Sequence, residues 1–581
     1  MKNTTVRLPK ILIINGPSEY FFHIPMGTFG ICDYLSRKNI EARLLNLALY
    51  DKDDLKEKLD YSIRNFRPTH IGIIFHWQET AEGAIWTAEQ IKSRNESIKV
   101  VCGGFAAGYF GENLLKRCNH LDFIIEGDPE KPLEDLLRGE DVSAIPNLIY
   151  RGNTGIRSND VSYFIDAETL SDISFCKVGY LYDHDLYLRA VENKLGFPLF
   201  IGRGCVFDCH YCGGSSKAFG IHSARNKPVV RSIESVISDL EHLKNHTKKI
   251  YICYENDRLY LKRLLRAIRK KKELVKTFQL NYGAWNLFDQ EFLELYRDVF
   301  AIGQESKPLF EISPEVFDDH ARRRIKGRKI FSIANLRKNL CLAEHFLGDC
   351  ARFSIFFSRY HDAIGTYNDL RNEIAGIFRL EHELFCEKIV NAQVFYDHLS
   401  TDVASSYWEK YVEKPRDVDT LVSAIRRIKT HETASFTFNN LCVYIPEALS
   451  EKDILKCELL IHILKVLKRE FRELFHVLFT CLDESVIGLI ESIIVEKYVT
   501  RSWNIFDALD HCQLLDYLKT ELTKRQISNH IPFLSDLINF SKKKIHMLQK
   551  RKACNERVSN AKAQIESLFS VSGRARLSQS S

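Results

Sequence analysis

The sequence predicts an α/β protein with an N-terminal doubly wound domain, a central partial (β/α)6 barrel and a C-terminal α-helical domain. Short, continuously apolar runs alternate with helical patterns, as expected for buried parallel strands and their crossover helices. This alternation is interrupted once, at residues 141–196. Beyond residue 415 the strand patterns fade and apolar residues recur at helical spacing, which indicates a change to all-helical structure.

The composition indicates a soluble globular chain. Hydrophobic residues make up 45% and charged residues 27% of the 581 positions, which excludes a disordered or collagen-like protein. The net charge of +6 is small for this length and does not indicate a nucleic-acid partner. Because we find neither a long apolar run nor a signal-peptide pattern, we expect a cytoplasmic protein without a membrane partner.

Residues 1–140 form the expected doubly wound domain. Its five predicted strands are residues 10–14, 42–47, 70–75, 99–102 and 121–125. Its four predicted helices are residues 27–38, 54–65, 81–93 and 132–137. Ligands of such domains bind at the carboxyl ends of the parallel strands. We therefore look for functional residues in the loops that follow these strands.

Residues 141–196 are interpreted as an irregular linker, and residues 197–415 as the barrel. The predicted barrel strands are residues 197–202, 249–254, 277–282, 309–313, 353–357 and 391–396. Helical patterns cover residues 232–243, 259–270 and 289–297. About six βα units predict an open or partial barrel rather than a closed eightfold one.

The C-terminal part, residues 416–570, is predicted to be α-helical. Apolar residues recur at helical spacing in residues 454–479, 485–499, 506–522 and 531–548. The last residues, 571–581, are polar and are expected to be a disordered tail.

Three of the 16 cysteines share one glycine-flanked loop after the first barrel strand. Cys205, Cys209 and Cys212 follow the spacing C-x3-C-x2-C. Three thiolates on one loop can bind three irons of a [4Fe–4S] cube and leave the fourth iron open to a substrate. The alternatives are unligated core cysteines, or a zinc site with His210 as its fourth ligand, although the sequence has no second C-x2-C pair.

This loop resembles the cluster loop of the radical S-adenosylmethionine (SAM) family in its spacing, its preceding strand and Tyr211 before the third cysteine. The resemblance implies that the three cysteines bind a [4Fe–4S] cluster whose open iron holds SAM. The stretch at 311–315 is similar to the Glu-Ile-x-Pro-Glu of cobalamin-type relatives, whereas residues 356–360 depart from the family's Gly-Leu-Pro-Gly. The SAM-binding residues implied by this resemblance are Tyr211, Gly213, Gly214, Glu255, Glu311 and Ser313.

A Rossmann-like domain in front of such a barrel resembles the cobalamin-dependent (class B) branch of the family, over roughly residues 8–400. The implied cobalamin-binding residues are Asn15, Gly16, Pro17, His76, Trp77, Gly103, Gly104, Glu126 and Gly127. The Asp-x-His-x-x-Gly motif that gives cobalt a histidine ligand is absent. Trp77 either shields the lower corrin face or packs in the core, and His76 is either a cobalt ligand or a hydrogen-bonded histidine at a strand end.

The resemblance implies a C-methyltransferase that consumes two molecules of SAM. One methylates cobalamin, and the other yields a 5′-deoxyadenosyl radical that abstracts hydrogen from an unactivated carbon. The substrate radical then takes the methyl group from methylcobalamin. The expected substrate is a natural-product intermediate or a peptide, and the expected electron donor is a flavodoxin- or ferredoxin-type protein.

Two other functions stay open. One is a non-methylating rearrangement, cyclisation or oxidation with the same cofactors. The other is a non-catalytic iron–sulfur protein whose SAM site has decayed. The sequence assigns no catalytic acid or base, and it does not define the substrate, the methylated atom, the lower ligand of cobalt or the oligomeric state.

Overall fold

The computed structural model forms two compact units, which are described separately. The first unit comprises Met1–Gly365 and Leu384–Pro446, and the second comprises Thr366–Glu383 and Glu447–Ser581. The residues that the structure describes are 9–18, 22–225, 227–253, 255, 257–303, 307–327, 330–389, 391–399, 401–410, 417–423, 448–497, 511–524, 538, 539 and 542.

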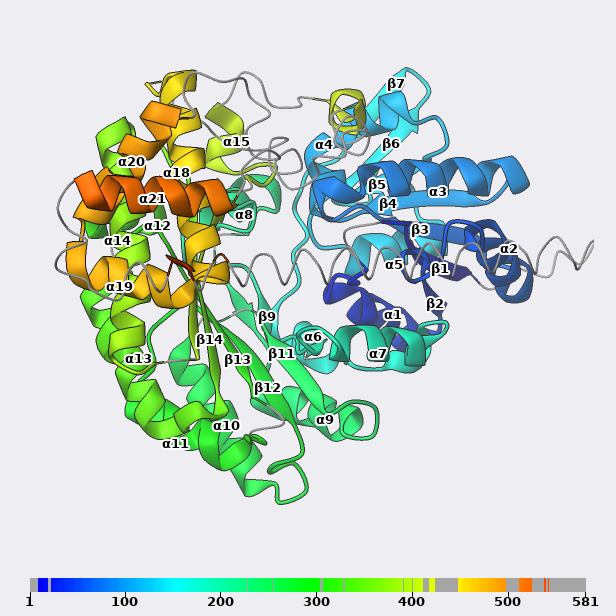
Figure 1. Cartoon of the computed structure of the whole chain (residues 1–581). Coiled ribbons are helices and arrows are strands. Elements are labelled where there is room, and N and C mark those ends of the chain that lie inside the picture. Colours follow the sequence, from blue (N-terminus) through cyan, green and yellow to red (C-terminus); the bar gives the residue numbers. More distant parts are fainter. Residues whose placement is uncertain are drawn as a thin grey trace, which may run out of the picture. The chain divides into compact units, whose positions relative to one another are not determined.

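The first unit begins with a seven-stranded sheet in the order β2-β1-β3-β4-β5-β6-β7 (Figure 1). The strands are β1 (Lys10–Asn15), β2 (Glu41–Asn46), β3 (His70–Ile74), β4 (Lys99–Gly103), β5 (Phe123–Ile125), β6 (Leu148–Gly152) and β7 (Gly155–Ser158). The helices are α1 (Gly27–Arg37), α2 (Leu55–Phe66), α3 (Ala81–Arg94), α4 (Phe105–Arg117) and α5 (Glu130–Arg138). Strands β1 to β5 are mutually parallel, and apolar residues of α2, α3 and α4 pack with alternate strand residues in one buried cluster. The expected doubly wound domain is confirmed.

In this region the sequence analysis omits one helix and makes one wrong prediction. Helix α4 was not predicted, although it connects β4 to β5. Residues 141–196 are not irregular, because they contain the β6–β7 hairpin, α6 (Ala167–Asp172) and α7 (His184–Glu192). The hairpin extends the sheet, since β6 pairs antiparallel with β5. The rest of the segment is packed as well: the buried ring of Phe175 stacks on Phe200 with centroids 4.1 Å apart.

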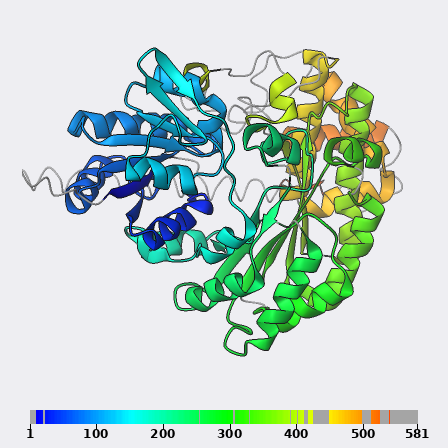
Figure 2. The same ribbon diagram turned by 180° about the vertical axis from the view of Figure 1, so that it is seen from behind.

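The second sheet has six parallel strands in the order β15-β14-β13-β12-β11-β8, and the strands run side by side in both views (Figures 1 and 2). The strands are β8 (Phe197–Pro198), β11 (Lys249–Ile252), β12 (Gln279–Ala284), β13 (Leu309–Glu315), β14 (Arg352–Arg359) and β15 (Ala392–His398). The helices between them are α8 (Ser216–His222), α9 (Ile233–Leu243), α10 (Arg258–Lys270), α11 (Gln290–Val299), α12 (Asp319–Lys326), α13 (Ile333–Leu347) and α14 (Tyr367–Cys386). The open six-stranded barrel agrees with the prediction.

The second unit is helical, as expected. Its described helices are α18 (Glu451–Glu470), α19 (Arg472–Leu482), α20 (Ser485–Lys497), α21 (His511–Lys524) and most of α14. Within this unit Arg371 of α14 forms an ion pair of 2.9 Å with Glu491 of α20. Most of the expected helix at 531–548 and the tail at 571–581 lie outside the described residues. Within the described part of the chain, no helix has both the length and the apolarity needed to cross a membrane.

The packing of the connecting segment on the first domain is testable at Gly30 of α1. A Cβ atom added there would lie 2.2 Å from the ring of the buried Phe175. We expect Gly30→Ala to destabilise the first unit by about 1–3 kcal/mol through overpacking. Gly179→Ala is the matched control, because nothing lies within 4 Å of its Cβ position. Equal thermal unfolding of the two variants would contradict this packing.

Candidate functional site

The three clustered cysteines lie on one loop between β9 (Gly202–Arg203) and α8. Cys205, Cys209 and Cys212 are all partly exposed, whereas the cysteines of the preceding doubly wound domain are buried. A thiol at the surface of a loop is accessible to a metal cluster, while a buried one is inert. The structure therefore brings the predicted ligands together on an accessible loop.

The environment of these thiols raises their pKa values and provides backbone N–H donors to two of the sulfur atoms. Burial raises the pKa of Cys205 to about 11, against the opposing effect of the Phe207 N–H, which donates to its Sγ at 3.3 Å. The Gly214 N–H likewise donates to Cys212 Sγ at 3.3 Å. Such thiols stay protonated in neutral solution unless a bound metal stabilises the thiolates. Backbone N–H donors to sulfur are also part of the surroundings that tune a bound cluster.

Among the residues that the structure describes, no three His, Cys, Asp or Glu side chains form a group that could hold a metal ion. A four-iron cube binds each thiolate at a different iron. It therefore does not require three sulfurs to converge on one point, as a single zinc ion does.

The segment after β15 supports the cysteine loop from one side. The Asp402 carboxylate accepts a hydrogen bond of 3.1 Å from the Gly213 N–H, and the Asp402 N–H donates to the Tyr211 carbonyl at 3.0 Å. A Cβ at Gly213 would lie 2.6 Å from the Val403 carbonyl oxygen, so this close approach requires glycine. Burial raises the pKa of Asp402 to about 6, although the Gly213 N–H lowers it.

Two of the predicted SAM-binding residues, Glu311 and Ser313, alternate along β13 and therefore share one face of the strand. The Tyr251 hydroxyl of β11 donates to Glu311 at 2.6 Å. Burial raises the pKa of Glu311, and the Tyr251 hydroxyl partly offsets this. Lys326 donates its Nζ proton to the Ser313 carbonyl at 2.5 Å. Tyr251 and Glu311 lie on β11 and β13 of the six-stranded sheet, whereas the cysteine loop follows β9, which pairs with β10 in a separate two-stranded sheet.

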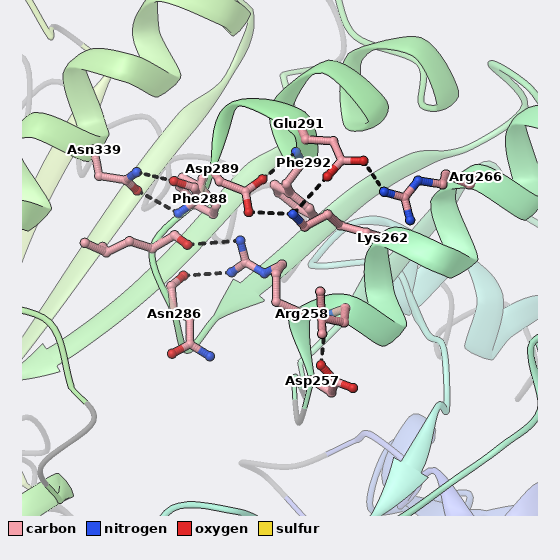
Figure 3. A network of polar contacts seen from close by, with 12 residues as sticks. Asp257, Arg258, Lys262, Arg266, Asn286, Phe288, Asp289, Glu291, Phe292 and Asn339 are labelled. Atoms are coloured by element: carbon pink, nitrogen blue, oxygen red, sulfur yellow. Dashed lines mark hydrogen bonds and ion pairs between the residues drawn. The ribbon is translucent and has the colours of Figure 1, made fainter.

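Glu255 is placed differently from the other predicted SAM-binding residues. It is 1% exposed, and its carboxylate accepts two hydrogen bonds from Arg258 and one of 3.3 Å from the Trp285 N–H. Arg258 also donates to the carbonyls of Asn286 and Leu287 at 2.9 and 3.1 Å (Figure 3). These contacts make Glu255 an anchor for Arg258 and for the loop after β12. They do not present its carboxylate to a ligand.

The nine predicted cobalamin-binding residues lie at or just after the carboxyl ends of β1, β3, β4 and β5, which are neighbours in the parallel sheet. The structure therefore gathers them along one edge. Two of the glycines are explained by the protein's own backbone. A Cβ at Gly16 would lie 2.7 Å from the Gly83 carbonyl oxygen, and one at Gly104, where φ is +118°, would lie 2.7 Å from the Phe75 carbonyl oxygen. A Cβ at Gly103 would meet only the Ile125 carbonyl oxygen, at 4.0 Å, so packing does not require glycine at this position.

Comparison with protein families assigns both sheets. Residues 14–137 match the B12 binding domain, and residues 199–334 match the radical SAM superfamily. The chain thus contains one region that matches a B12 binding domain and one that matches the radical SAM superfamily. The resemblance drawn from the sequence is thus confirmed, together with the cofactor set of cobalamin, SAM and a [4Fe–4S] cluster. Which residues contact these cofactors stays a prediction.

The chain is also similar to individual proteins. It is 25% identical over 286 residues to the "Uncharacterized methyltransferase PH0819" of Pyrococcus horikoshii, which covers 46% of this chain and 58% of that protein. The chain thus spans little more than half the length of this curated relative. Two structures of the radical SAM methyltransferase TsrM from Kitasatospora setae share its fold. The one with tryptophan and aza-SAM has a TM-score of 0.54, 14% identity and coverage of 69% and 76% of the two chains. The one with cobalamin and [4Fe–4S] cluster has a TM-score of 0.53, 15% identity and coverage of 69% and 74%.

His76 of the B12-binding domain is a hydrogen-bonded histidine at a strand end. Burial lowers its pKa to about 4, so its imidazole is neutral at physiological pH. The Phe105 N–H donates to Nδ1 at 3.4 Å, which places the ring proton on Nε2. A protonated Nε2 has no lone pair for cobalt, and this disfavours His76 as a ligand. The partly exposed Trp77 packs edge-on against it, with ring centroids 4.9 Å apart.

Gln78, the next residue along, is a functional candidate that no sequence motif indicates. Its Nε2 donates to the Thr401 carbonyl at 3.0 Å, and its Oε1 accepts a hydrogen bond of 3.0 Å from the Val403 N–H. Both partners flank Asp402, which binds the cysteine loop. Because the partners lie more than 300 positions apart in sequence, no local pattern could have indicated this link.

His361 in the radical SAM domain was also missed. It follows β14, in the region where the sequence departs from the family's Gly-Leu-Pro-Gly stretch. The side chain is fully buried, its Nε2 lies 3.0 Å from the Ser358 hydroxyl, and its ring contacts Tyr211 with centroids 5.7 Å apart. Burial lowers its pKa to about 3, so the ring is neutral. His361 thus packs against the aromatic residue between the second and third cysteines.

Glu79 has the properties of a proton carrier. It lies in the loop after β3, and burial raises its pKa to about 7, with a further contribution from the charge of Asp402. A carboxyl group that titrates near neutral pH can hold or release a proton during a reaction. The sequence alone could not reveal this, because the shift arises from folding.

The raised pKa of Glu79 predicts a pH-dependent stability. As pH rises from its ordinary value of 4.5 to about 7, the unfolded chain ionises Glu79 while the folded chain keeps it protonated. Folding is therefore penalised progressively through this window, and fully above it. We expect Glu79→Gln to raise the stability of the first unit by roughly 2–3 kcal/mol at pH 8 and by much less at pH 5.

Thermal unfolding at the two pH values measures this difference. Glu96→Gln, which changes an exposed carboxyl, should have the same unfolding midpoint as the wild type at each of the two pH values. A Glu79→Gln midpoint that follows the wild type at every pH would contradict the raised pKa.

Proposed function

We propose that this protein is a cobalamin-dependent radical SAM methyltransferase acting on an unactivated carbon of a natural-product intermediate or a peptide. The observation that carries the proposal is the short chain of contacts between the two cofactor domains. Gln78, beside the expected corrin site, binds Thr401 and Val403, and the intervening Asp402 binds Gly213 of the cysteine loop. These contacts join the loop expected to hold cobalamin to the loop expected to hold the cluster, as an enzyme that uses both cofactors on one substrate requires.

The relatives support methyl transfer. The curated relative is named a methyltransferase, and the two structures that share this fold are of a methyltransferase, one of them with tryptophan bound. The chemistry itself comes from the cofactors: cobalamin supplies a methyl group, and SAM at the cluster supplies a hydrogen-abstracting radical. We propose Cys205, Cys209 and Cys212 as the cluster ligands.

The chain's own residues position and shield these groups. Trp77 provides an apolar surface at the cobalamin edge, and neutral His76 adds no charge there. Glu79 keeps a proton on its carboxyl group up to about neutral pH and can donate a hydrogen bond to a substrate. Glu311 and Tyr251 offer a paired carboxylate and hydroxyl on the radical SAM sheet for the polar groups of SAM.

The proposal includes a cytoplasmic setting and reduction of the cluster by a flavodoxin- or ferredoxin-type donor. It includes no nucleic-acid or membrane partner. The substrate is expected to be a small molecule or a peptide.

Metal content tests the cofactor assignment. Protein reconstituted without oxygen, with iron, sulfide and hydroxocobalamin, should hold about four irons and one cobalt per chain. Cys209→Ala should lose most of the iron and keep its cobalt. Cys341→Ala, which removes an exposed cysteine elsewhere in the barrel, should keep both. Full iron without cobalt would overturn the methyltransferase proposal.

Product analysis separates methylation from the alternative reactions. With SAM and a reductant, the reconstituted protein should form S-adenosylhomocysteine in proportion to its cobalt. Protein reconstituted without hydroxocobalamin should form none and still release 5′-deoxyadenosine. If the complete protein makes 5′-deoxyadenosine but no S-adenosylhomocysteine, it catalyses a non-methylating radical reaction instead.

A further inference from the structure

Two acidic side chains of the B12-binding domain are buried directly beside the expected cobalamin edge. Asp128 and Glu130 follow Glu126 and Gly127 in the loop after β5, and they are 8% and 0% exposed. Burying two carboxylates side by side is strongly unfavourable unless cations are buried with them. The segment that carries these carboxylates must therefore lie against cationic side chains.

The counter-charges come from the radical SAM domain. Arg203 donates through Nη1 to Asp128 at 3.0 Å and to Glu130 at 3.1 Å, and through Nη2 to Glu130 at 2.5 Å. Arg225 forms a second ion pair with Asp128. Burial pushes the pKa of Asp128 upward, but the two guanidinium groups bring it below its ordinary value, so the carboxylate is charged.

These two arginines lie where the chain enters the cysteine loop, which we call the neck of the loop (residues 203 and 204 with Arg225 and Pro228). Arg203 lies two residues before Cys205, in a two-residue strand that pairs with Val229 and Val230. The neck is tight: at Gly204, where φ is +83°, a Cβ would lie 3.1 Å from Pro228 and 3.2 Å from the Arg225 side chain. A displacement of Arg203 is thus transmitted directly to the first cluster cysteine.

The other side of the same loop is held by Asp402 and, through its neighbours, by Gln78. The cysteine loop is therefore attached to the cobalamin edge at two separated points. The contact through Gln78 consists of neutral hydrogen bonds, whereas the contact through Arg203 consists of buried, bidentate ion pairs. Losing Arg203 would leave the buried carboxylate of Glu130 without its cation, whereas Asp128 would keep Arg225, and an uncompensated buried charge is the costlier loss.

We propose that Arg203 is a positioning residue that clamps the cysteine loop to the Asp128–Glu130 loop and thereby fixes the spacing between the cluster and cobalamin. This inference rests on the proposed function, because the spacing matters only if both cofactors act on one substrate. The proposed role of Arg203 requires no contact with either cofactor. It acts by holding two loops in register.

The chain offers a matched control in Arg231. This arginine is also buried, and it pairs with Asp239 at 2.7 Å, but its partner lies on α9 within the radical SAM domain. Arg231→Gln and Arg203→Gln therefore both break a buried arginine–carboxylate ion pair. Only the second breaks one that joins the two domains.

The clamp is first measured in the full-length chain as purified, by hydrogen–deuterium exchange. We expect Arg203→Gln to speed amide exchange about tenfold in peptides covering residues 123–130 and 160–166, because Glu130 loses its cation and Asp128, which accepts from the Ile165 N–H, loses one of its two. Arg203→Lys should give a smaller effect, since lysine keeps the charge without the two-pronged geometry. Arg231→Gln should leave residues 123–130 unchanged. Equal exchange at 123–130 in Arg203→Gln and wild type would overturn the clamp.

The spacing itself is measured by pulsed electron paramagnetic resonance between the reduced cluster and cob(II)alamin in the reconstituted protein. Wild type and Arg231→Gln should share one narrow distance distribution, and Arg203→Gln should broaden it at unchanged iron and cobalt content. An unbroadened distribution in Arg203→Gln would refute the positioning role and leave the proposed function intact. Wild-type protein that takes up no cobalt would overturn the proposed function, and the positioning role with it.

Discussion

The geometry of the first unit depends on the direction of its strands. In a parallel sheet every strand ends at the same edge. The loops that follow β1, β3, β4 and β5 therefore lie along that edge, whatever their own sequences are. The barrel sheet obeys the same constraint, and the segment after β15 lies at its carboxyl edge. Two parallel sheets in one compact unit therefore generate two loop surfaces. These two loop surfaces are joined by the contacts of Gln78, Asp402 and Arg203.

Much of this architecture was predictable because parallel strands are continuously apolar. The strand predictions agree with the structure to within a few residues, except that the first barrel strand is reduced to β8 and β9. Helix α4 was not recognised in the sequence because a glycine interrupts its helical pattern, and Gly111 adopts φ of +28° within the helix. Strand β7 was not recognised because none of its residues is buried, so its sequence shows no apolar alternation. The strand is stabilised by its antiparallel pairing with β6.

The candidate site was predictable only where chemistry depends on local spacing. The three cysteines are close in sequence, so their spacing alone was enough to recognise the loop. Glu255 shows the limit of such reasoning, because a carboxylate after a strand looks the same whether it faces a ligand or, as here, Arg258. Gln78, His361 and Asp402 owe their positions to segments far away in the chain. The shifted pKa values of Glu79 and Asp402 arise from burial, which is a property of the fold and not of the residue.

Helix α14 is divided between the two units, since residues 366–383 belong to the second unit and residue 384 returns the chain to the first. The helical unit is therefore assembled from an internal segment and the C-terminal segment together. Its ion pair between Arg371 and Glu491 joins the two. Recombination between relatives that exchanged only the C-terminal segment would separate these partners. The unit can pass intact from one ancestor to another only when both segments are inherited together, so the two should share one evolutionary history.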